Sequence, residues 1–421
     1  MPVDATIPFL IEGEGNGFCT EPASGMLNME SQRKAMPRIA YLDYNATTPL
    51  DSRVLQAMLP CLQEEWGNPS SVHDWGQSAR YAVEKARAQV ADLVGASDEH
   101  LVFTGTGSES ICQVLHSVAK KWRGQSCHIL TSAIEHPATL RSLEQLHQDG
   151  MIQYSTVLPE HSGWIDPKRV ESMIRSDTRL ISIMSANNET GIIQPLPEIA
   201  DLARSRVIAI HSDMVQSLGK INLRFDDLQL DFASFAAHKI YGPKGIGALA
   251  FREKGDLIPL LHGGGQEMGL RAGTEYTAGI VGFGAAAALC REFLPEEATR
   301  ITRLRDQFEE QLKKKIDGLH ILGADQARLP GTSCICFEAL LGTYLVQDLA
   351  AEGIAISSGS ACRVGESKPS HILLAMGIDP ELARGAVRFS LGRFTTEDEI
   401  LQAAELTRLA VLQLRQNPEK I

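Results

Sequence analysis

Several features that define other protein classes are scarce in this 421-residue chain. Its eight cysteines are few and lack the dense spacing of a small secreted protein, which indicates a reducing compartment and predicts a cytoplasmic location. No uncharged apolar run of about 18 or more residues is present, so no membrane-spanning segment is predicted. Lysine and arginine number 40 against 52 acidic residues, and the net charge of −12 argues against direct nucleic-acid binding.

The length and the 43% apolar content favour two globular domains. Residues 1–37 are rich in Gly, Glu, Pro and Met and fit neither a secretory nor a mitochondrial signal, so we predict a disordered extension. Residues 38–290 are predicted to form a large domain and residues 291–421 a smaller one. The first residues of the large domain are expected to pack on the small domain.

Short apolar runs alternate with helical periods, which is typical of an α/β fold. A helix is indicated by the spacing of Val83, Ala86, Val90 and Leu93, and Gly95 is a stop signal. Buried strands are predicted at residues 101–103, 127–130, 180–184 and 207–210, with further strands at 231–235 and 247–251. Near the end of the chain, Thr396 and Glu399 have the spacing of a capping box.

Lys239, in the run Ala-His-Lys-Ile-Tyr-Gly-Pro-Lys-Gly, is a candidate covalent catalyst, because a lysine amine condenses with an aldehyde to form a Schiff base. A pyridoxal ring also needs a carboxylate for its nitrogen and a donor for its oxygen. Asp213 and Gln216 follow a predicted strand, where ligand groups gather in α/β sheets. His136 can stack on such a ring. The alternatives are that Lys239 is a surface lysine in a turn and that His136 is an ordinary loop histidine.

Residues 103–110 predict a strand end, a glycine-bearing turn and a helix start, with Gly107 and Ser108 in the turn. Backbone N–H groups at such a helix start bind anions, so phosphate is a candidate ligand. The dinucleotide fingerprint fails, since position 110 is Ser where a glycine is needed.

Cys362 lies among Ser, Gly and Ala and precedes Arg363, which describes an exposed thiol near positive charge. The alternative is a small buried hydrophobic residue. Cys334 and Cys336 are too close for a zinc knuckle and are interpreted as one face of a strand. No metal site is predicted. Two arginines, Arg388 and Arg393, compete as partners for a substrate carboxylate.

These motifs together resemble the cysteine desulfurase family, which includes selenocysteine lyases. It belongs to class V of the fold-type-I aminotransferases dependent on pyridoxal 5'-phosphate (PLP). The resemblance runs from about Tyr41 to the C-terminus. It rests on the runs at residues 41–49, 67–71, 187–191, 236–245, 263–267 and 271–274, and on the Cys362 loop.

The resemblance implies an α/β fold with a mainly parallel seven-stranded sheet in a large PLP-binding domain, and a smaller α/β C-terminal domain. It implies that Lys239 holds PLP and that Cys362 carries sulfur as a persulfide. The resemblance further implies that the ring is contacted by Asp213, Gln216, Asn188 and His136, and that His136 also moves protons. It also implies that phosphate is bound by Gly107, Ser108 and His238, with Thr274 reaching in from the second subunit of a homodimer. Substrate is implied to be bound by Asn45 and Arg388.

The function implied is removal of sulfur from L-cysteine to give L-alanine, followed by transfer to sulfur-acceptor proteins. Three alternatives remain open at this point: a selenocysteine lyase acting on L-selenocysteine, a class V aminotransferase, and a non-catalytic scaffold in sulfur trafficking. The chain departs from the family pattern at several positions. Ala236 stands where a serine is usual, and Met268 where an arginine is common.

Overall fold

The computed structural model describes residues 38–358 and 369–416. Within them the helices are α2 (Ser52–Gln63), α3 (Asp74–Val94), α4 (Gly107–Lys121), α5 (Pro137–Gln148), α6 (Pro167–Ser172), α7 (Leu196–Ser205), α8 (Thr277–Lys315), α9 (Gly342–Ala351), α10 (His371–Ala375), α11 (Pro380–Arg384) and α12 (Glu397–Arg415). The predicted extension at residues 1–37 and the Cys362 loop lie outside the described residues.

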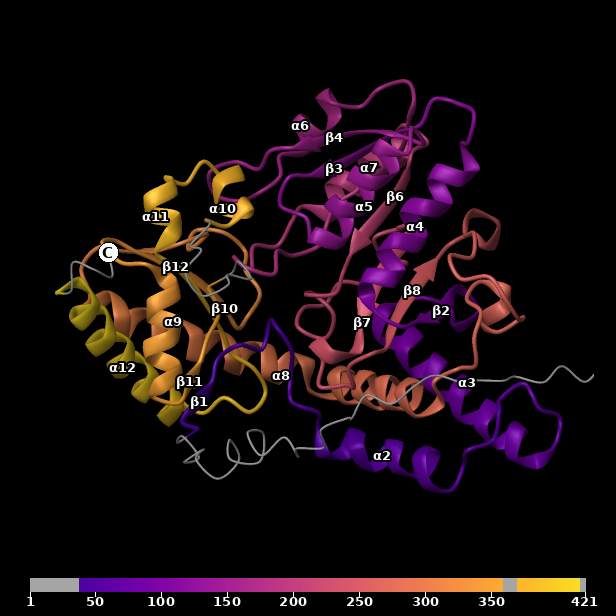
Figure 1. Cartoon of the computed structure of the whole chain (residues 1–421), viewed down its shortest axis with the longest axis horizontal. Coiled ribbons are helices and arrows are strands. Elements are labelled where there is room, and N and C mark those ends of the chain that lie inside the picture. The colour runs from indigo at the N-terminus through magenta and orange to yellow at the C-terminus, as the bar shows by residue number, and fades with distance from the viewer. Residues whose placement is uncertain (1–37, 359–368, 417–421) are drawn as a thin grey trace, which may run out of the picture. The chain divides into compact units, whose positions relative to one another are not determined.

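A seven-stranded sheet with the strand order β2-β8-β7-β6-β5-β3-β4 forms the larger layer (Figure 1). Its strands are β2 (Leu101–Thr104), β3 (His128–Ser132), β4 (Gln153–Val157), β5 (Thr178–Ser182), β6 (Ala209–Asp213), β7 (Phe232–Ala236) and β8 (Gly247–Phe251). Only β8 runs antiparallel to its neighbours. The expected mainly parallel seven-stranded sheet is therefore confirmed.

The predicted strands match this sheet with two differences. β4 had no predicted counterpart, because its sequence Gln-Tyr-Ser-Thr-Val is exposed at the start and lacks a continuous apolar run. The strand predicted from Val207 begins instead at Ala209. Val207 is 95% exposed and has a φ of 55°, because its N–H closes the end of α7 by bonding to the carbonyl of Arg204.

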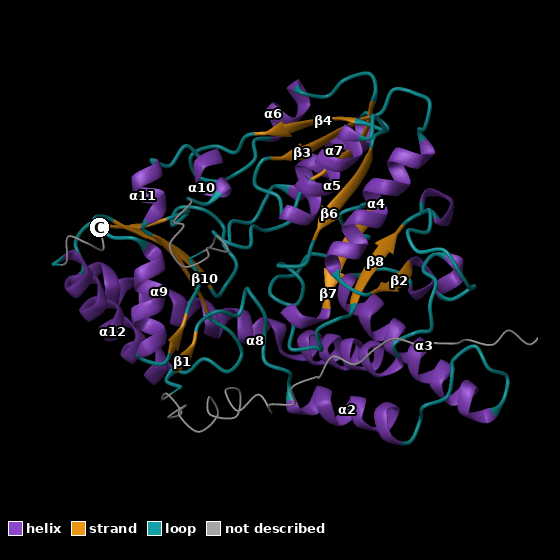
Figure 2. Ribbon diagram, in the orientation of Figure 1, coloured by secondary structure: helices purple, strands orange, loops and turns teal. Residues whose placement is uncertain are grey.

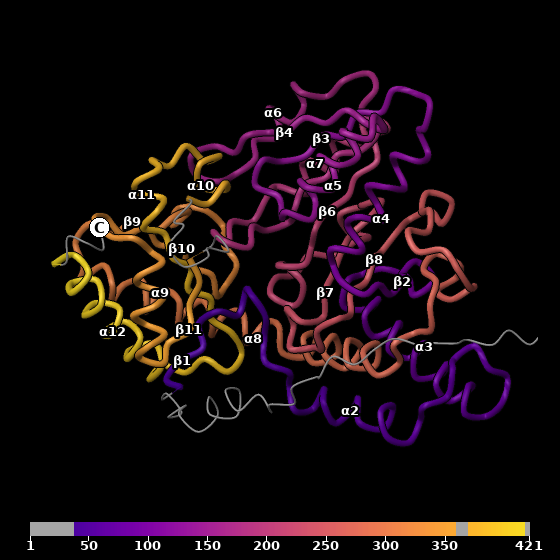
Figure 3. Tube along the Cα trace, viewed as in Figure 1, coloured from indigo at the N-terminus to yellow at the C-terminus, as the bar shows by residue number. Residues whose placement is uncertain are grey.

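A smaller antiparallel sheet has the order β12-β10-β9, and a separate parallel pair joins β1 to β11 (Figure 2). The strands are β1 (Ala40–Tyr41), β9 (Leu319–Ile321), β10 (Thr332–Phe337), β11 (Ile354–Ala355) and β12 (Ala386–Ser390). Figure 3 shows β1 beside β11, although more than three hundred residues separate them in the chain. Cys334 and Cys336 are both buried on β10, as the strand interpretation expected.

Helix α8 is shared between the two regions. Its first half packs on α2 and α3, beside the larger sheet, and its second half packs on α12, with Leu304 and Phe308 in the core of the smaller region. The first half is long and apolar enough to cross a membrane by composition alone, but half of that window is buried inside the protein. The predicted domain boundary at residue 290 falls within this helix, and the division stays a prediction.

Local signals fix the ends of several helices. Gly95 ends α3 in a left-handed conformation with a φ of 72°, as its position predicted. Thr396 and Glu399 form the expected capping box at the start of α12. Thr106 caps α4 by accepting a hydrogen bond from the N–H of Glu109. This last cap positions one end of the candidate site.

Candidate active site

The carboxyl ends of the parallel strands meet at one edge of the large sheet, and a cavity of about 420 Å³ lies there. The smaller region closes it with Arg388 of β12 and with Ser357. Ten of the residues predicted from the sequence line this cofactor cavity: Asn45, Gly107, Ser108, His136, Asn188, Asp213, Gln216, His238, Lys239 and Arg388. The structure therefore brings together candidates that are spread over more than three hundred residues of sequence.

One end of the cofactor cavity is built for an anion. Gly107 and Ser108 form the first turn of α4, where free N–H groups and the helix dipole favour negative charge. A Cβ atom at Gly107 would lie 2.9 Å from a methyl carbon of Val215, so a side chain here would crowd the wall. His238 lines the same cavity. Ala236 lines it too, and has no hydroxyl to donate.

Lys239 follows β7 in a short 3-10 turn, and its Nζ donates hydrogen bonds to the carbonyls of Asn45 at 2.6 Å and Ala46 at 2.8 Å. No carboxylate within the described residues forms an ion pair with it. Removal of water and, to a smaller extent, the nearby Arg388 guanidinium together lower the pKa of Lys239 to about 8. A useful fraction of this amine is therefore unprotonated and nucleophilic near neutral pH.

Asp213 is the last residue of β6, and its Oδ1 accepts a hydrogen bond from the N–H of Val215 at 3.0 Å. The side chain is buried, and burial raises the pKa of its carboxyl. No arginine or lysine forms an ion pair with Asp213 in the described part of the chain. A buried acid of this kind is suited to a cationic partner that arrives with a ligand.

His136 is the N-cap of α5, and its Nδ1 accepts a hydrogen bond from the N–H of Ala138 at 3.1 Å. This contact leaves the proton of the neutral ring on Nε2. Burial lowers the pKa of His136, so the imidazole is neutral at physiological pH. A neutral ring lining the cofactor cavity is suited both to stacking and to exchanging a proton.

Arg388 lies on β12 and is buried at the cofactor cavity. Its Nη2 pairs with Asp43 Oδ1 at 2.7 Å, and its Nη1 donates to the carbonyl of Asn188 at 2.9 Å. Arg388 Nε and Asn188 Oδ1 are buried without a hydrogen-bond partner among the described residues. Unsatisfied buried polar atoms at a cavity wall indicate a missing polar ligand.

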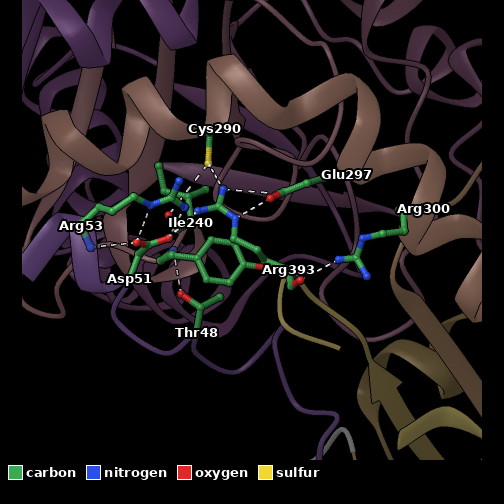
Figure 4. Close-up of polar contacts among 9 residues, drawn as sticks. Thr48, Asp51, Arg53, Ile240, Cys290, Glu297, Arg300 and Arg393 are labelled. Carbon is green, nitrogen blue, oxygen red and sulfur yellow. Dashed lines mark hydrogen bonds and ion pairs between the residues drawn. The ribbon is translucent and has the colours of Figure 1, made fainter. Parts of the chain in front are cut away.

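Arg393, the competing arginine, is fully engaged elsewhere (Figure 4). Its guanidinium pairs with Asp51 and Glu297 and lies 4.3 Å from the centre of the Tyr241 ring. Its Nη2 also contacts the Cys290 thiol. Arg393 does not line the cofactor cavity. The geometry therefore selects Arg388 as the carboxylate candidate.

Among the predicted site residues that the structure describes, one does not line the cofactor cavity. Thr274 is exposed on the glycine-rich segment before α8, and its expected role toward a second subunit stays a prediction. Cys362 lies outside the described residues. Sequence reasoning missed Ser357, Ile111, Met184 and Asp43. Asp43 and Ser357 carried a signal, since Asp43 belongs to the run at residues 41–49 and Ser357 begins the small-residue run before Cys362, whereas Ile111 and Met184 are ordinary in their local sequence.

The cavity has the groups that PLP needs. A helix N-terminus with Gly107 and Ser108 suits a phosphate, and Asp213 suits a protonated ring nitrogen. Lys239 has a free amine for the aldehyde. The unpartnered Asn188 Oδ1 and Arg388 Nε supply further polar atoms. The donor set therefore fits this cofactor.

Comparison with known proteins agrees with that fit. Residues 40–402 match the family described as Aminotransferase class-V. The chain belongs to the cysteine desulfurases of this family. It is 40% identical over 381 residues to "Cysteine desulfurase IscS" of Dictyoglomus turgidum, covering 90% of this chain and 96% of the relative.

Solved structures of cysteine desulfurase relatives share the fold. A "NIFS-LIKE PROTEIN" superposes with a TM-score of 0.84 at 36% identity, covering 89% of this chain and all of that one. "SspA in complex with cysteine" superposes with a TM-score of 0.76 at 36% identity, covering 85% of this chain and all of that one. The expected fold-type-I architecture is confirmed, and members of this family are PLP-dependent enzymes.

Proposed function

We propose that this protein is a PLP-dependent cysteine desulfurase that converts L-cysteine to L-alanine and holds the sulfur as a persulfide on Cys362. The single observation that carries the proposal is the convergence of Lys239, Asp213 and Arg388 on one cavity. An amine of lowered pKa, a buried acid and a guanidinium with an unpartnered Nε are the three groups that an amino-acid PLP enzyme needs.

In this proposal Gly107, Ser108 and His238 would hold the cofactor phosphate, Asp213 would pair with the ring nitrogen, and Gln216 would donate to the ring oxygen. His136 would stack on the ring, and Asn188 would contact it. When bound, PLP acts as an electron sink for the bonds at the amino-acid Cα. Thr274 is assigned to the phosphate bound by a second subunit, so the proposed active form is a homodimer. The proposed location of the protein is the cytoplasm.

Arg388 lines the cavity and binds the substrate carboxylate with its guanidinium. Asn45 lies beside it through its hydrogen bond to the Asn188 carbonyl. Lys239, with a pKa of about 8, is able both to accept the Cα proton and to return it. Neutral His136 carries its mobile proton on Nε2.

The sulfur step needs a nucleophile, which is assigned to Cys362. Its thiolate attacks the substrate sulfur, the Cβ–S bond breaks, and the electron pair of that bond goes to the substrate carbon. That carbon gains a proton, so cysteine and the enzyme thiol become alanine and an enzyme persulfide. A sulfur-acceptor protein then takes the outer sulfur by attack of its own nucleophile.

The test compares Lys239→Ala and Cys362→Ser with Lys244→Ala and Cys61→Ser as matched controls. We expect Lys239→Ala to lose the visible absorbance of bound PLP and all alanine formation. Cys362→Ser should keep that absorbance and lose persulfide formation from cysteine. Both controls should resemble the unchanged protein, since Lys244 is exposed and Cys61 lies on α2.

Normal turnover of cysteine by Cys362→Ser would contradict the assignment of the sulfur carrier. If Cys362→Ser turns over selenocysteine normally but no longer turns over cysteine, the protein has a selenocysteine lyase activity in addition to the proposed one. Absence of any PLP attached at Lys239 would favour a non-catalytic scaffold.

A further inference from the structure

Lys220 contacts two residues of the cofactor cavity from behind, without lining that cavity itself. It lies in the turn after β6, four residues beyond Gln216. Its Nζ donates to Gln216 Oε1 at 2.8 Å and to Asn45 Oδ1 at 3.0 Å. The proposed chemistry gives Lys220 no role.

The position of Lys220 is energetically unfavourable for a lysine. Part of its side chain is accessible from two adjoining cavities of about 30 and 590 Å³, yet no described carboxylate pairs with its ammonium. Removal of water lowers its pKa well below the usual value, and the neighbouring cations Lys239 and Arg388 lower it further. A lysine amine that has no carboxylate partner and lies near other cations adds little to the stability of the fold, so its presence points to function.

The hydrogen bonds around Lys220 are consistent with only one orientation of each amide. Gln216 Nε2 donates to the Asn45 carbonyl at 3.0 Å, and Asn45 Nδ2 donates to Thr332 Oγ1 at 2.9 Å. If either amide rotated by half a turn, its NH2 group would face the Lys220 donor, and its oxygen would face an acceptor or lose its partner. Lys220 therefore specifies which end of each amide faces the cavity side.

We propose that Lys220 is a positioning residue of the cofactor site, which orients the Asn45 and Gln216 amides by donating a hydrogen bond to the oxygen of each. The inference rests on the proposed function, because Gln216 is there assigned to the PLP ring oxygen. Of the two N–H bonds on Gln216 Nε2, one serves the Asn45 carbonyl and the second remains for the cofactor.

The same contacts connect Lys220 to Lys239. The Asn45 carbonyl accepts hydrogen bonds from both Gln216 Nε2 and Lys239 Nζ. A displaced Gln216 amide removes one donor from that carbonyl, and the place where the Lys239 amine rests then changes. Lys220 thus acts on the cofactor through Gln216 and Asn45, and not by touching the cofactor.

A double-mutant cycle tests this inference. The dissociation constant of PLP is measured by titrating the cofactor-free protein, for Lys220→Met, Gln216→Leu and the combined variant. Lys244→Met is the matched control, since this exposed lysine belongs to the same half of the chain. Lys220→Gln is a second, milder variant, and melting temperatures report on folding in each case.

We expect Lys220→Met and Gln216→Leu each to weaken PLP binding about 5- to 10-fold, as for one lost hydrogen bond. The combined variant should be no weaker than the weaker single variant, because both changes remove the same contact. Lys220→Met should melt at or above the temperature of the unchanged protein. Lys220→Gln should show a smaller loss, and its KM for cysteine should change less than its kcat.

Independent, multiplying effects in the combined variant would overturn the positioning role of Lys220. A lowered melting temperature with unchanged PLP affinity would also overturn it, by showing a structural role. If Gln216→Leu alone leaves PLP binding unchanged, the proposed contact between Gln216 and the ring fails instead. The two failures are therefore distinguishable.

Discussion

Arg388 and Arg393 are five residues apart, and each is buried against an aspartate from the start of the described chain. Arg388 pairs with Asp43 but leaves its Nε unpartnered at the wall of the cofactor cavity. The Arg393 guanidinium contacts the carboxylates of Asp51 and Glu297 and one aromatic ring. The Arg388 guanidinium therefore keeps one N–H without a protein partner, whereas the Arg393 guanidinium is fully paired within the protein.

This difference separates a binding group from a structural one. The Arg393 cluster, consisting of Asp51, Tyr241, Cys290, Glu297 and Arg393, joins the start of α2, the turn after Lys239, helix α8 and the loop after β12. The polar groups of the Arg393 cluster bind one another and are not available to a ligand. The cofactor cavity has the opposite character, since its acid, its amine and its guanidinium each lack a full set of protein partners.

The strongest test of the comparison is Arg393→Met. This change leaves Asp51 and Glu297 without their shared cation, and breaking a buried ion pair from one side costs about 3–5 kcal/mol of unfolding free energy. Chemical denaturation followed by circular dichroism measures this loss. Arg303→Met is the control, because Arg303 is exposed on α8, the helix that carries Glu297, and should change stability by under about 0.5 kcal/mol. Equal losses in the two variants would contradict a structural role.

Arg388→Met should affect catalysis more than stability. We expect kcat/KM for cysteine to fall about 100-fold, mainly through KM, because a two-pronged contact with the substrate carboxylate is lost. Arg384→Met on nearby α11 provides the control, since Arg384 pairs only with Glu381 at the surface. A large fall in stability with unchanged KM would show that Arg388 resembles Arg393 after all.

The smallest expected effect is a shift of pH dependence. With a pKa of about 8, only about a tenth of Lys239 is unprotonated at pH 7. Capture of a pyridoxal aldehyde by the cofactor-free protein should therefore rise about tenfold per pH unit below pH 7, about fivefold from pH 7 to pH 8, and level off above about pH 9. The Arg388 guanidinium lowers this pKa by repelling the ammonium form. Arg388→Met should therefore raise the pKa and move the curve to higher pH, whereas Arg393→Met should leave it in place. A shift toward lower pH would contradict this account.

The chemistry that a pyridoxal cofactor needs predicted Lys239, Asp213, Gln216 and His136, and the family resemblance added Asn45, Asn188 and His238 to the residues of the cofactor cavity. Asp213 ends β6, and Lys239 and His136 follow β7 and β3, so all three lie at the edge of the sheet where ligand groups meet. The seven-stranded sheet was implied by the family resemblance, and six of its strands were predicted from short apolar runs, whereas β4 was missed because its start is polar and exposed.

Residue type alone did not decide between Arg388 and Arg393, and only the family resemblance favoured Arg388. Both arginines carry the same chemistry, and only their partners distinguish them. Asp43, Asp51 and Glu297 are far away in the chain, so the pairing exists only after folding. Lys220 escaped notice in a similar way, because an isolated lysine in a turn gives no hint that two amides will surround it.

Helix α8 has a consequence for how the protein melts. Its 39 residues form a rod of about 58 Å, which serves as a wall of both hydrophobic cores. If one hydrophobic core loses its packing on α8, the helix is no longer held along its whole length, and the other core is disturbed as well. Heating is therefore expected to disrupt both regions in a single cooperative step.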